Sequence, residues 1–391
     1  MIGKAVFPGG NAQSLDNIAG QPIAEYIHTK SGTVHKLEGP AKAKNIVFKA
    51  TGDYSDGDTW TLNNTPVTVT YNGGEELLPT AVLIGDVLQA VVMGNQLRLM
   101  LQKPTPQESL LHNGDFRKRK VVNQKTQDSY KVNGYTIDRF IFYSDIGKHT
   151  LTITDDGIVL SSGGTNNPWI RQISEDTFTI GNMYTYTVQA KASVAGNAIG
   201  LKVSNADNYD QGIIKWFEGT TDFQNFSYTF NMPYKHAAFE LIGSINGDIT
   251  AARLKLEPGN RFTGWPAWDY GAELLKCQRY LLGIRPDNYK EGIIPIGQGV
   301  ATTNGKVRFL IPTPVPMRTR PVLNVNINNL RVVSTTPDVA NGIIPQTVNN
   351  MFYSNSLIFI DVYAQGLTAG NAYELYLYGT TTDTMLFSAE L

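Results

Sequence analysis

The chain has 391 residues, enough for about two to four domains that each bury a core. It contains 37 Gly, 19 Pro, 19 Tyr and 16 Phe, and only 17% of its residues are charged, a composition that favours strands and turns over helices. The 33 Lys and Arg nearly balance the 34 Asp and Glu, which excludes the long-range field that gathers nucleic acid or an anionic membrane. We therefore expect an all-β protein whose ligand is neutral.

A single cysteine, Cys277, excludes an intrachain disulfide framework and a cysteine-based zinc cluster, so core burial or oligomerisation must stabilise the chain. No apolar run approaches the roughly 20 residues that span a bilayer, so we expect no membrane insertion. The N-terminal sequence MIGKAVFPGGNAQ has only a very short apolar stretch, which does not fit a secretory signal. If the protein acts outside a cell, we expect it to leave by another route, such as lysis.

The N-terminal quarter of the chain divides into two predicted parts. Residues 1–44 mix Gly, Pro, Asn and Lys without sustained periodicity, which predicts an extended arm that attaches to a partner. From about residue 45 the apolar residues alternate, and the pairs Asn63-Asn64 and Gly94-Asn95 each stand between two such runs, as hairpin turns do. Residues 45–103 are therefore predicted to form a small β-module of about four strands.

A linker and a larger domain follow. The prolines of QKPTPQ favour an extended backbone, so residues 104–109 are predicted to be a linker. Residues 110–268 hold about eight strand-like runs separated by turns. In one run Tyr184, Tyr186 and Val188 share a face, as in a half-buried strand of a sandwich. This pattern predicts a jelly-roll β-sandwich that resembles carbohydrate-binding domains.

One amphipathic helix is predicted over residues 269–283, as a bridge between two β-rich regions. Asp269 is a good N-cap, Glu273 suits the positive end of the helix dipole, and Pro286 prevents continuation. Three residues follow a three-then-four spacing and should form the buried face: Leu274, Cys277 and Leu281. Residues 284–391 contain further strand-like runs, such as KVRFLIP and SLIFIDVYA, and are predicted to form a C-terminal β-sandwich.

Four short motifs in this order carry a resemblance. They are N-G-D-F, L-E-P-G, E-L-x-x-C-Q-R-Y and a strand ending in P-M-R, at Asn113–Phe116, Leu256–Gly259, Glu273–Tyr280 and Pro316–Arg318. Together they resemble the distal parts of bacteriophage and prophage tail-fibre or receptor-binding proteins. The stretch DGDTWTLNNTPVTVTYNGGEELL also resembles a small module near the N-terminal side of such proteins. The resemblance implies a virion structural protein that forms a homotrimer with a virion-proximal N-terminus, and it identifies no catalytic residue.

Sequence signatures of catalysis are weak. The histidines are scattered without the spacing of a zinc site: His28, His35, His112, His149 and His236. The segment GQGVATTNGKV lacks the glycine spacing of a phosphate loop, and the chain has no G-x-S-x-G elbow. Cys277 has no activating partner nearby in the sequence. We therefore expect no catalytic residue, no metal and no cofactor.

Charged clusters leave alternatives open. The stretches DYSDGDTW and SNADNYDQG gather Asp and Asn in loops, where turn formation is favoured over calcium binding because neither fits the twelve-residue calcium loop. The run Arg117–Lys120 is favoured as a solvated surface over a site for an anionic polymer. A glycosidase needs only two carboxylates, brought together by the fold, so sequence does not exclude one.

Aromatic residues give the more specific prediction of a site. Sugars present apolar C–H faces ringed by hydroxyls, so their sites pair an exposed Trp or Tyr with Asn, Asp or Gln. The jelly roll offers both types of residue, and the candidate ligand-binding residues are Trp169, Asn205, Asp207, Tyr209, Asp210 and Trp216. The favoured alternative for both tryptophans is that they point into the core. Tyr209, whose neighbours are polar, is expected to be the most exposed.

Three functions follow as hypotheses. The favoured one is a non-enzymatic phage virion fibre or adhesin that binds a host cell-surface receptor, a glycan in preference to a protein, through many weak sites. Other virion proteins would contact its N-terminal arm. The first alternative is a structural head fibre or capsid decoration protein, and the second is a glycan depolymerase similar to a tailspike. The favoured hypothesis places the protein in the virion, after assembly in the host cytoplasm and release without a signal peptide.

Overall fold

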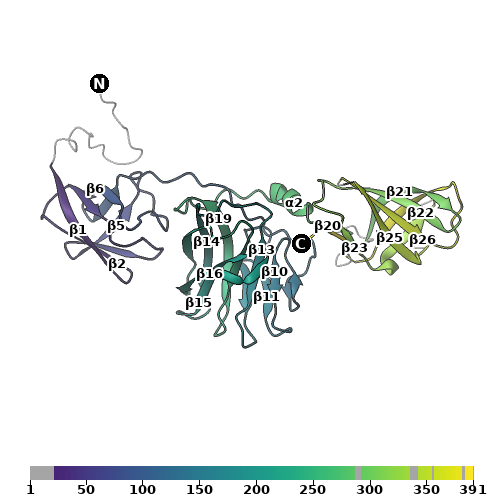
Figure 1. The fold of residues 1–391 in the computed structure, drawn as a ribbon, viewed down its shortest axis with the longest axis horizontal. Coiled ribbons are helices and arrows are strands. Elements are labelled where there is room, and N and C mark those ends of the chain that lie inside the picture. The colour runs from purple at the N-terminus through teal and green to yellow at the C-terminus, as the bar shows by residue number, and fades with distance from the viewer. Residues whose placement is uncertain (1–21, 287–291, 335–341, 355, 381–383, 391) are drawn as a thin grey trace, which may run out of the picture.

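The computed structural model describes the backbone of residues 22–286, 292–334, 342–354, 356–380 and 384–390. Figure 1 shows three β-rich bodies in a row, with helix α2 (Tyr270–Gln278) between the second and the third. Strands dominate each body, which confirms the predicted all-β fold class. Among the described residues, no helix is long and apolar enough to cross a membrane.

The first body is a closed barrel in the strand order β1-β2-β4-β5-β7-β6-β3. Its strands are β1 (Ile23–Ser31), β2 (Val34–Glu38), β3 (Asn45–Lys49), β4 (Thr59–Leu62), β5 (Thr65–Thr70), β6 (Val87–Met93) and β7 (Gln96–Leu99). Parallel pairing of β1 with β3 closes the sheet on itself, so the barrel leaves no free sheet edge. Leu37, Phe48 and Leu97 are among the residues that fill its core.

The structure of the barrel contradicts one domain boundary predicted from the sequence and confirms two predicted hairpin turns. The extended arm predicted over residues 1–44 is wrong for 23–38, because these residues form β1 and β2 and complete the barrel. Residues 1–21 of that predicted arm lie outside the described residues. The two predicted hairpins are present: Asn63 and Asn64 adopt positive φ angles of 47° and 63° between β4 and β5, and Gly94 has a φ of 66° between β6 and β7.

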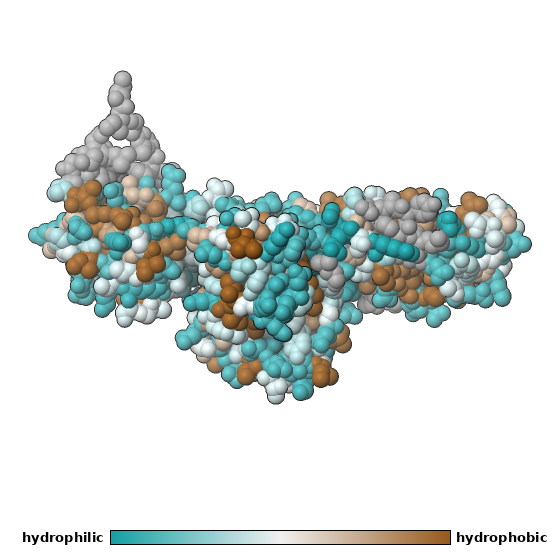
Figure 2. Space-filling view, viewed as in Figure 1, coloured by the Kyte–Doolittle hydropathy of each residue, from teal (hydrophilic) through white to brown (hydrophobic). Residues whose placement is uncertain are grey.

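Apolar side chains also lie on the outside of the barrel. Figure 2 shows that apolar residues gather over this body in the view drawn. Ile23 and Ile27 of β1 and Val87 of β6 are among its exposed large hydrophobic residues. Exposed apolar surface of this kind is a common property of protein-binding surfaces.

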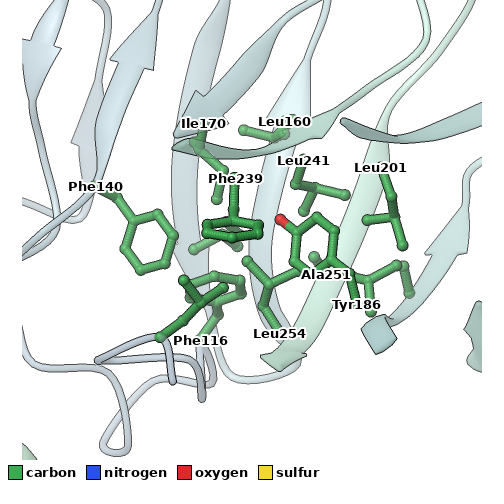
Figure 3. Packing of buried hydrophobic residues seen from close by; sticks show 14 of the residues in the cluster. Phe116, Phe140, Leu160, Ile170, Tyr186, Leu201, Phe239, Leu241, Ala251 and Leu254 are labelled. Atoms are coloured by element: carbon green, nitrogen blue, oxygen red, sulfur yellow. The ribbon is translucent and has the colours of Figure 1, made fainter. Parts of the chain in front are cut away.

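The second body is a β-sandwich of two six-stranded sheets, ordered β16-β15-β18-β13-β10-β9 and β17-β14-β19-β12-β11-β8. Its strands are β8 (Ser129–Tyr130), β9 (Gly134–Tyr135), β10 (Ile141–Tyr143), β11 (Thr150–Thr154), β12 (Gly157–Ser161), β13 (Trp169–Ile173), β14 (Met183–Ala192), β15 (Ala198–Asn205), β16 (Asn208–Glu218), β17 (Gln224–Asn231), β18 (Ala237–Ile242) and β19 (Ile249–Pro258). Figure 3 shows the packing between the sheets, with Phe116 beside Phe140 and Tyr186 beside Phe239. Tyr186 and Val188 of β14, which the sequence predicts to share one face, are both buried in this core.

Helix α2 begins as predicted and ends earlier. The Asp269 side chain accepts a hydrogen bond from the backbone N–H of Ala272, which confirms the N-cap, and Cys277 is buried. The helix predicted to reach residue 283 is wrong beyond Gln278. Leu281 instead starts strand β20 (Leu281–Ile284), which pairs with β28 (Met385–Ser388) near the end of the chain.

The third body is a second β-sandwich, with a three-stranded sheet β20-β28-β23 and a six-stranded sheet β24-β27-β21-β22-β26-β25. Its remaining elements are β21 (Ile293–Thr303), β22 (Lys306–Pro312), β23 (Val322–Asn324), the 3-10 helix η1 (Ile327–Asn329), β24 (Leu330–Val333), β25 (Thr347–Ser354), β26 (Leu357–Tyr363) and β27 (Ala372–Tyr378). Phe309, Leu375 and Phe387 are buried in the core between the two sheets.

Polar contacts hold the barrel against the first sandwich. Arg261 follows the L-E-P-G motif, and its guanidinium donates to both carboxylate oxygens of Asp86 (2.8 and 3.0 Å) and to the carbonyl of Ala81 (2.6 Å). The carboxylate of Asp56 accepts hydrogen bonds from the backbone and side chain of Asn225. One terminal nitrogen of Arg261 thus binds Asp86 while the other binds a backbone carbonyl of the barrel, so these contacts orient the two bodies.

The N-G-D-F and E-L-x-x-C-Q-R-Y motifs meet in space. Asn113 is fully buried, and its backbone N–H donates to the Glu273 carboxylate of helix α2 (2.7 Å). Its side chain donates to the carbonyls of Val122 and Asp138 and accepts from the Val122 N–H. A Cβ on Gly114 would lie 2.2 Å from a backbone carbonyl oxygen, so only glycine fits there. These motif residues therefore join the helix to the sandwich.

A chain of hydrogen bonds crosses the barrel interior. The Thr51 N–H donates to Nδ1 of His28 (3.0 Å), which places the His28 proton on Nε2. That Nε2 donates to Nδ1 of His35 (2.9 Å), and Nε2 of His35 donates to Asp58 (3.0 Å), whose carboxylate also binds Lys30. Burial, His35 and Lys30 lower the pKa of His28 from 6.5 to about 4. A proton on Nδ1 would face the Thr51 N–H, so the folded barrel disfavours protonated His28.

We predict that the barrel loses stability as the pH falls from about 6.5 towards 4. In this window the unfolded chain binds the His28 proton and the folded barrel does not, so the stabilisation is complete above 6.5 and is lost towards the folded pKa. Hydrogen-exchange free energies of β1 and β2 should fall across this window, and His28→Gln should flatten the change. The exposed His236→Gln is the matched control, and equal slopes in the three proteins would contradict the prediction.

Candidate functional site

The solvent-facing side of the sheet β16-β15-β18-β13-β10-β9 gathers the predicted site residues. Directly paired residues of antiparallel strands point to the same side of a sheet. One cross-strand row, the aromatic row, contains Tyr143, Trp169, Ile242, Gly200 and Trp216. The neighbouring row, the charged row, contains Ile141, Arg171, Glu240, Lys202 and Ile214. Ile170, Leu241 and Leu201 alternate with these residues and lie in the core, so both rows lie on what we call the outer face.

Trp216 is the exposed aromatic of the outer face. It lies on the edge strand β16, and 42% of its surface is accessible to solvent. A Cβ built on Gly200, its partner in β15, would lie 2.7 Å from indole atom Cζ3 and 3.0 Å from Cε3. The six-membered ring therefore lies over the bare backbone of Gly200. The absence of a side chain at Gly200 gives Trp216 the space to lie against the sheet.

Trp169 is part of a stack of side chains. Its ring is nearly parallel to that of Tyr143, at 6° and a centroid distance of 5.2 Å. The guanidinium carbon of Arg171 lies 4.3 Å from the Trp169 ring centroid and 3.7 Å from the ring centroid of Tyr209. Cation–π contacts of this length hold both rings in place. Trp169 and Tyr209 are half-buried as a result, and less of their surface is open to a ligand than that of Trp216.

Charges in the middle of the outer face form one network. The carboxylate of Glu240 is buried and accepts hydrogen bonds from Arg171 (3.0 Å) and from the Ser204 hydroxyl (2.7 Å). Lys202 lies 3.4 Å from the same carboxylate and donates to the carbonyl of Tyr209 (3.0 Å). Two cations and one carboxylate leave this network with an excess of positive charge, and its polar groups stand beside the aromatic row.

The structure places all six predicted residues at one sheet. Trp169, Tyr209 and Trp216 share the outer face, so the expectation that the tryptophans point into the core is wrong. Asn205, Asp207 and Asp210 lie at the turn between β15 and β16, where the Asn205 side chain accepts from the Asp207 N–H. Tyr209 is half-buried rather than the most exposed residue, because Arg171 packs against its ring. Whether these residues bind a ligand stays a prediction.

Sequence reasoning missed four residues of the outer face: Tyr143, Arg171, Lys202 and Glu240. Arg171 stands two positions after Trp169 in WIRQI, and a spacing of two puts both on the same side of a strand. That signal was present in the sequence. Tyr143, Lys202 and Glu240 reach the site only through the pairing of strands that are distant in sequence.

Carboxyl groups with raised pKa values lie elsewhere. Burial raises the pKa of Asp138 to about 7, and both of its oxygens accept hydrogen bonds from Gln124. Burial also raises the pKa of Glu390, which lies near Arg139. Neither group belongs to the rows of the outer face. Within the part of the chain that the structure describes, no group of three or more His, Cys, Asp or Glu is arranged to hold a metal ion.

No protein-family model and no curated protein matches this sequence. Similar solved structures include one titled as a CBM4 module (18% identity, 38% of this chain and 98% of that chain covered, TM-score 0.27). A family 29 carbohydrate-binding module from Piromyces equi has 13% identity, with 33% and 91% covered and a TM-score of 0.25. The enzymatically active domain of tailspike protein 4 from bacteriophage CBA120 has 14% identity, with 34% and 19% covered and a TM-score of 0.23. At these values no function is transferred to this chain.

We predict that Gly200→Ala displaces the Trp216 ring, because the new Cβ would lie closer to the indole than van der Waals contact allows. In protein labelled with 5-fluorotryptophan, the fluorine resonance of Trp216 should shift while that of Trp60 in the barrel stays in place. Gly305→Ala is the matched control, since nothing lies within 4 Å of its added Cβ. A Trp216 resonance that is the same in both variants would contradict the packing of the ring on Gly200.

Proposed function

We propose that this chain is a glycan-binding protein and that the outer face of the first sandwich is its binding surface. The observation that carries the proposal is the exposed ring of Trp216, supported by the Gly200 backbone beside the charged row. An indole ring held against a sheet offers a rigid apolar platform to the C–H face of a sugar. The hydroxyls around that face would meet the partly exposed Lys202, which stands on the neighbouring charged row.

The length of the aromatic row supports an extended ligand. Trp216 and Trp169 are separated by three strand spacings, about 14 Å at about 4.8 Å per strand. A single sugar ring is shorter than this, so the row suits several linked sugars lying across the strands. Between the two tryptophans the bare backbone of Gly200 keeps the surface low.

We infer that the protein is a binder rather than an enzyme. Glycoside hydrolysis uses two carboxyl groups about 5 to 9.5 Å apart, one on each side of the scissile bond. In the aromatic and charged rows, Glu240 is the one carboxylate, and three neighbouring groups neutralise and hold it. Such a carboxylate positions other side chains and is poorly placed to transfer a proton or attack a sugar.

We propose further that the chain is a virion fibre or adhesin of a phage, located in the virion as a homotrimer, and that it attaches to a host cell-surface glycan. The motif resemblance at Asn113–Phe116 and Glu273–Tyr280 supports this role. The row of three bodies in Figure 1 suits a fibre, and the exposed Ile23, Ile27 and Val87 of the barrel suit contact with another virion protein. Several copies would turn weak glycan binding into useful avidity.

Trp216→Ala should weaken glycan binding at least about tenfold, because a central aromatic that covers a ligand contributes about 2 kcal/mol or more. Binding would be measured on an array of microbial surface glycans and as retention on bacteria that bind the wild type. Tyr270→Ala is the matched control, since Tyr270 is 43% exposed but lies on helix α2. Equal losses in the two variants, or no wild-type binding to any glycan on the array, would remove the outer face as the site.

Incubation with the polysaccharide of a bacterium that retains the protein should leave the polymer length unchanged. The reason is that the outer face offers one neutralised carboxylate where hydrolysis uses two. Size-exclusion chromatography of the polymer before and after incubation measures the effect. Shortening that persists in Trp216→Ala protein would assign depolymerase activity to another part of the chain.

A further inference from the structure

A cavity of about 260 Å³ lies where the first sandwich meets the end of helix α2. Arg279 and Tyr280, the last two residues of the E-L-x-x-C-Q-R-Y motif, line it, whereas Glu273 and Cys277 of the same motif pack against the sandwich. The cavity has room for several waters or for one small molecule. Its lining includes no residue of the aromatic or charged rows, so it is separate from the outer face.

Arg139 is the most unusual residue of this cavity. Its side chain is buried, with the residue only 2% exposed, and the guanidinium carbon lies 3.5 Å from the ring centroid of Tyr280. One terminal nitrogen donates to the Ile173 carbonyl (3.0 Å) and the other lies 3.7 Å from the Glu390 carboxylate, but Nε has no hydrogen-bond partner among the described residues. The Arg139 backbone has a φ of 74° in the left-handed region. Both the unpaired donor and the strained backbone cost free energy, and such costs gather at binding sites.

His112 supplies a second unpaired atom beside Arg139. Its Nδ1 is buried without a hydrogen-bond partner among the described residues. The backbone of His112 is held firmly, because Gln172 accepts from its N–H and donates to its carbonyl, each at 2.8 Å. Burial and the charge of Arg139 lower the pKa of His112, so the ring is neutral and can present an N–H from Nδ1.

Carboxylates lie on the other side of the cavity. Glu175 accepts from the Tyr280 hydroxyl (2.8 Å), forms an ion pair with Arg279 at 3.9 Å and pairs with Arg318. Asp176 lines the cavity and is exposed. The cations Lys276 and Arg279 also line the cavity, and the two carboxylates among these cations can accept hydrogen bonds from hydroxyl groups. The cavity therefore combines donors for one carboxylate with acceptors for hydroxyls.

We propose that this pocket binds one hydroxylated monocarboxylate of about monosaccharide size, that is, a sugar acid. Its carboxylate would bind Arg139 and His112, and its hydroxyl groups would face Glu175 and Asp176. Arg318 belongs to the segment after the first strands of the C-terminal sandwich and contacts Glu175 directly. A bound sugar acid would thus strengthen the joint between the two sandwiches as well as occupy the cavity.

The test uses D-glucuronate as the probe with the full-length protein, followed by calorimetry and by the NMR titration of the His112 ring. Saturable binding of glucuronate is expected, with glucose and inorganic phosphate each at least about tenfold weaker, because glucose lacks the carboxylate and phosphate lacks the ring hydroxyls that would bind Glu175 and Asp176. Bound glucuronate should also raise the pKa of His112, since a carboxylate favours the protonated ring. No saturable binding, or equal binding of glucose, would overturn the proposal.

Variants locate the site. Arg139→Lys keeps the charge and removes the planar fork, and it should weaken glucuronate at least about tenfold. Since Arg139 is buried, the half-exposed Arg279→Ala, which removes another cation of the cavity lining, serves as a second variant and should weaken binding severalfold. Gly305→Ala is the matched control and should leave glucuronate binding unchanged, because nothing lies within 4 Å of its added Cβ; Trp216→Ala is added to tell this cavity from the outer face. Full binding in both arginine variants would place the glucuronate outside this cavity, and a loss of binding in Trp216→Ala would assign it to the outer face.

Discussion

Asn113 is the residue on which the arrangement of the central and C-terminal bodies depends. It is fully buried, and its hydrogen bonds tie three segments together: the strand-free start of the sandwich, the loop before β10 and helix α2. A buried amide with every partner in place specifies one geometry, because a shifted helix would leave polar groups unpaired. After the helix, Tyr280 packs against Arg139 of the first sandwich, and β20, the first strand of the second sandwich, follows. The N-G-D-F motif that contains Asn113 thus has a structural role.

The outer face differs from the inner face of the same sheet in the chemistry of its side chains. The inward side chains of its strands are Ile, Leu, Val and Phe, and the outward ones include Trp, Arg, Glu and Lys in two adjacent rows. Arg171 and Glu240 neutralise each other below the surface level, while Trp216 stays accessible over Gly200. The outer face is rigid because its side chains contact one another in the absence of a ligand. A preformed surface of this kind loses little conformational entropy on binding.

Local features were predictable from sequence, and long-range ones were not. The Asn63-Asn64 turn and the Asp269 N-cap depend on a few neighbouring residues, so their patterns predict them well. The early end of helix α2 depends on pairing with β28, more than a hundred residues away, and local helix propensity carries no information about it. The site was partly predictable for the same reason: Trp169 and Tyr209 were found by composition, whereas Glu240 joins them through cross-strand register.

The contacts of Arg261 determine how freely the barrel can turn relative to the first sandwich. Its ion pair with Asp86 and its hydrogen bond to the Ala81 carbonyl leave the barrel little freedom to rotate relative to the sandwich. If a flexible linker joined the barrel to the sandwich, the outer face could point in any direction. Each binding event would then lose conformational entropy. Because Arg261 fixes the barrel to the sandwich, the orientation of the barrel also sets the direction of the outer face. Copies assembled around a common axis would then present their outer faces at equal angles, as a coordinated array.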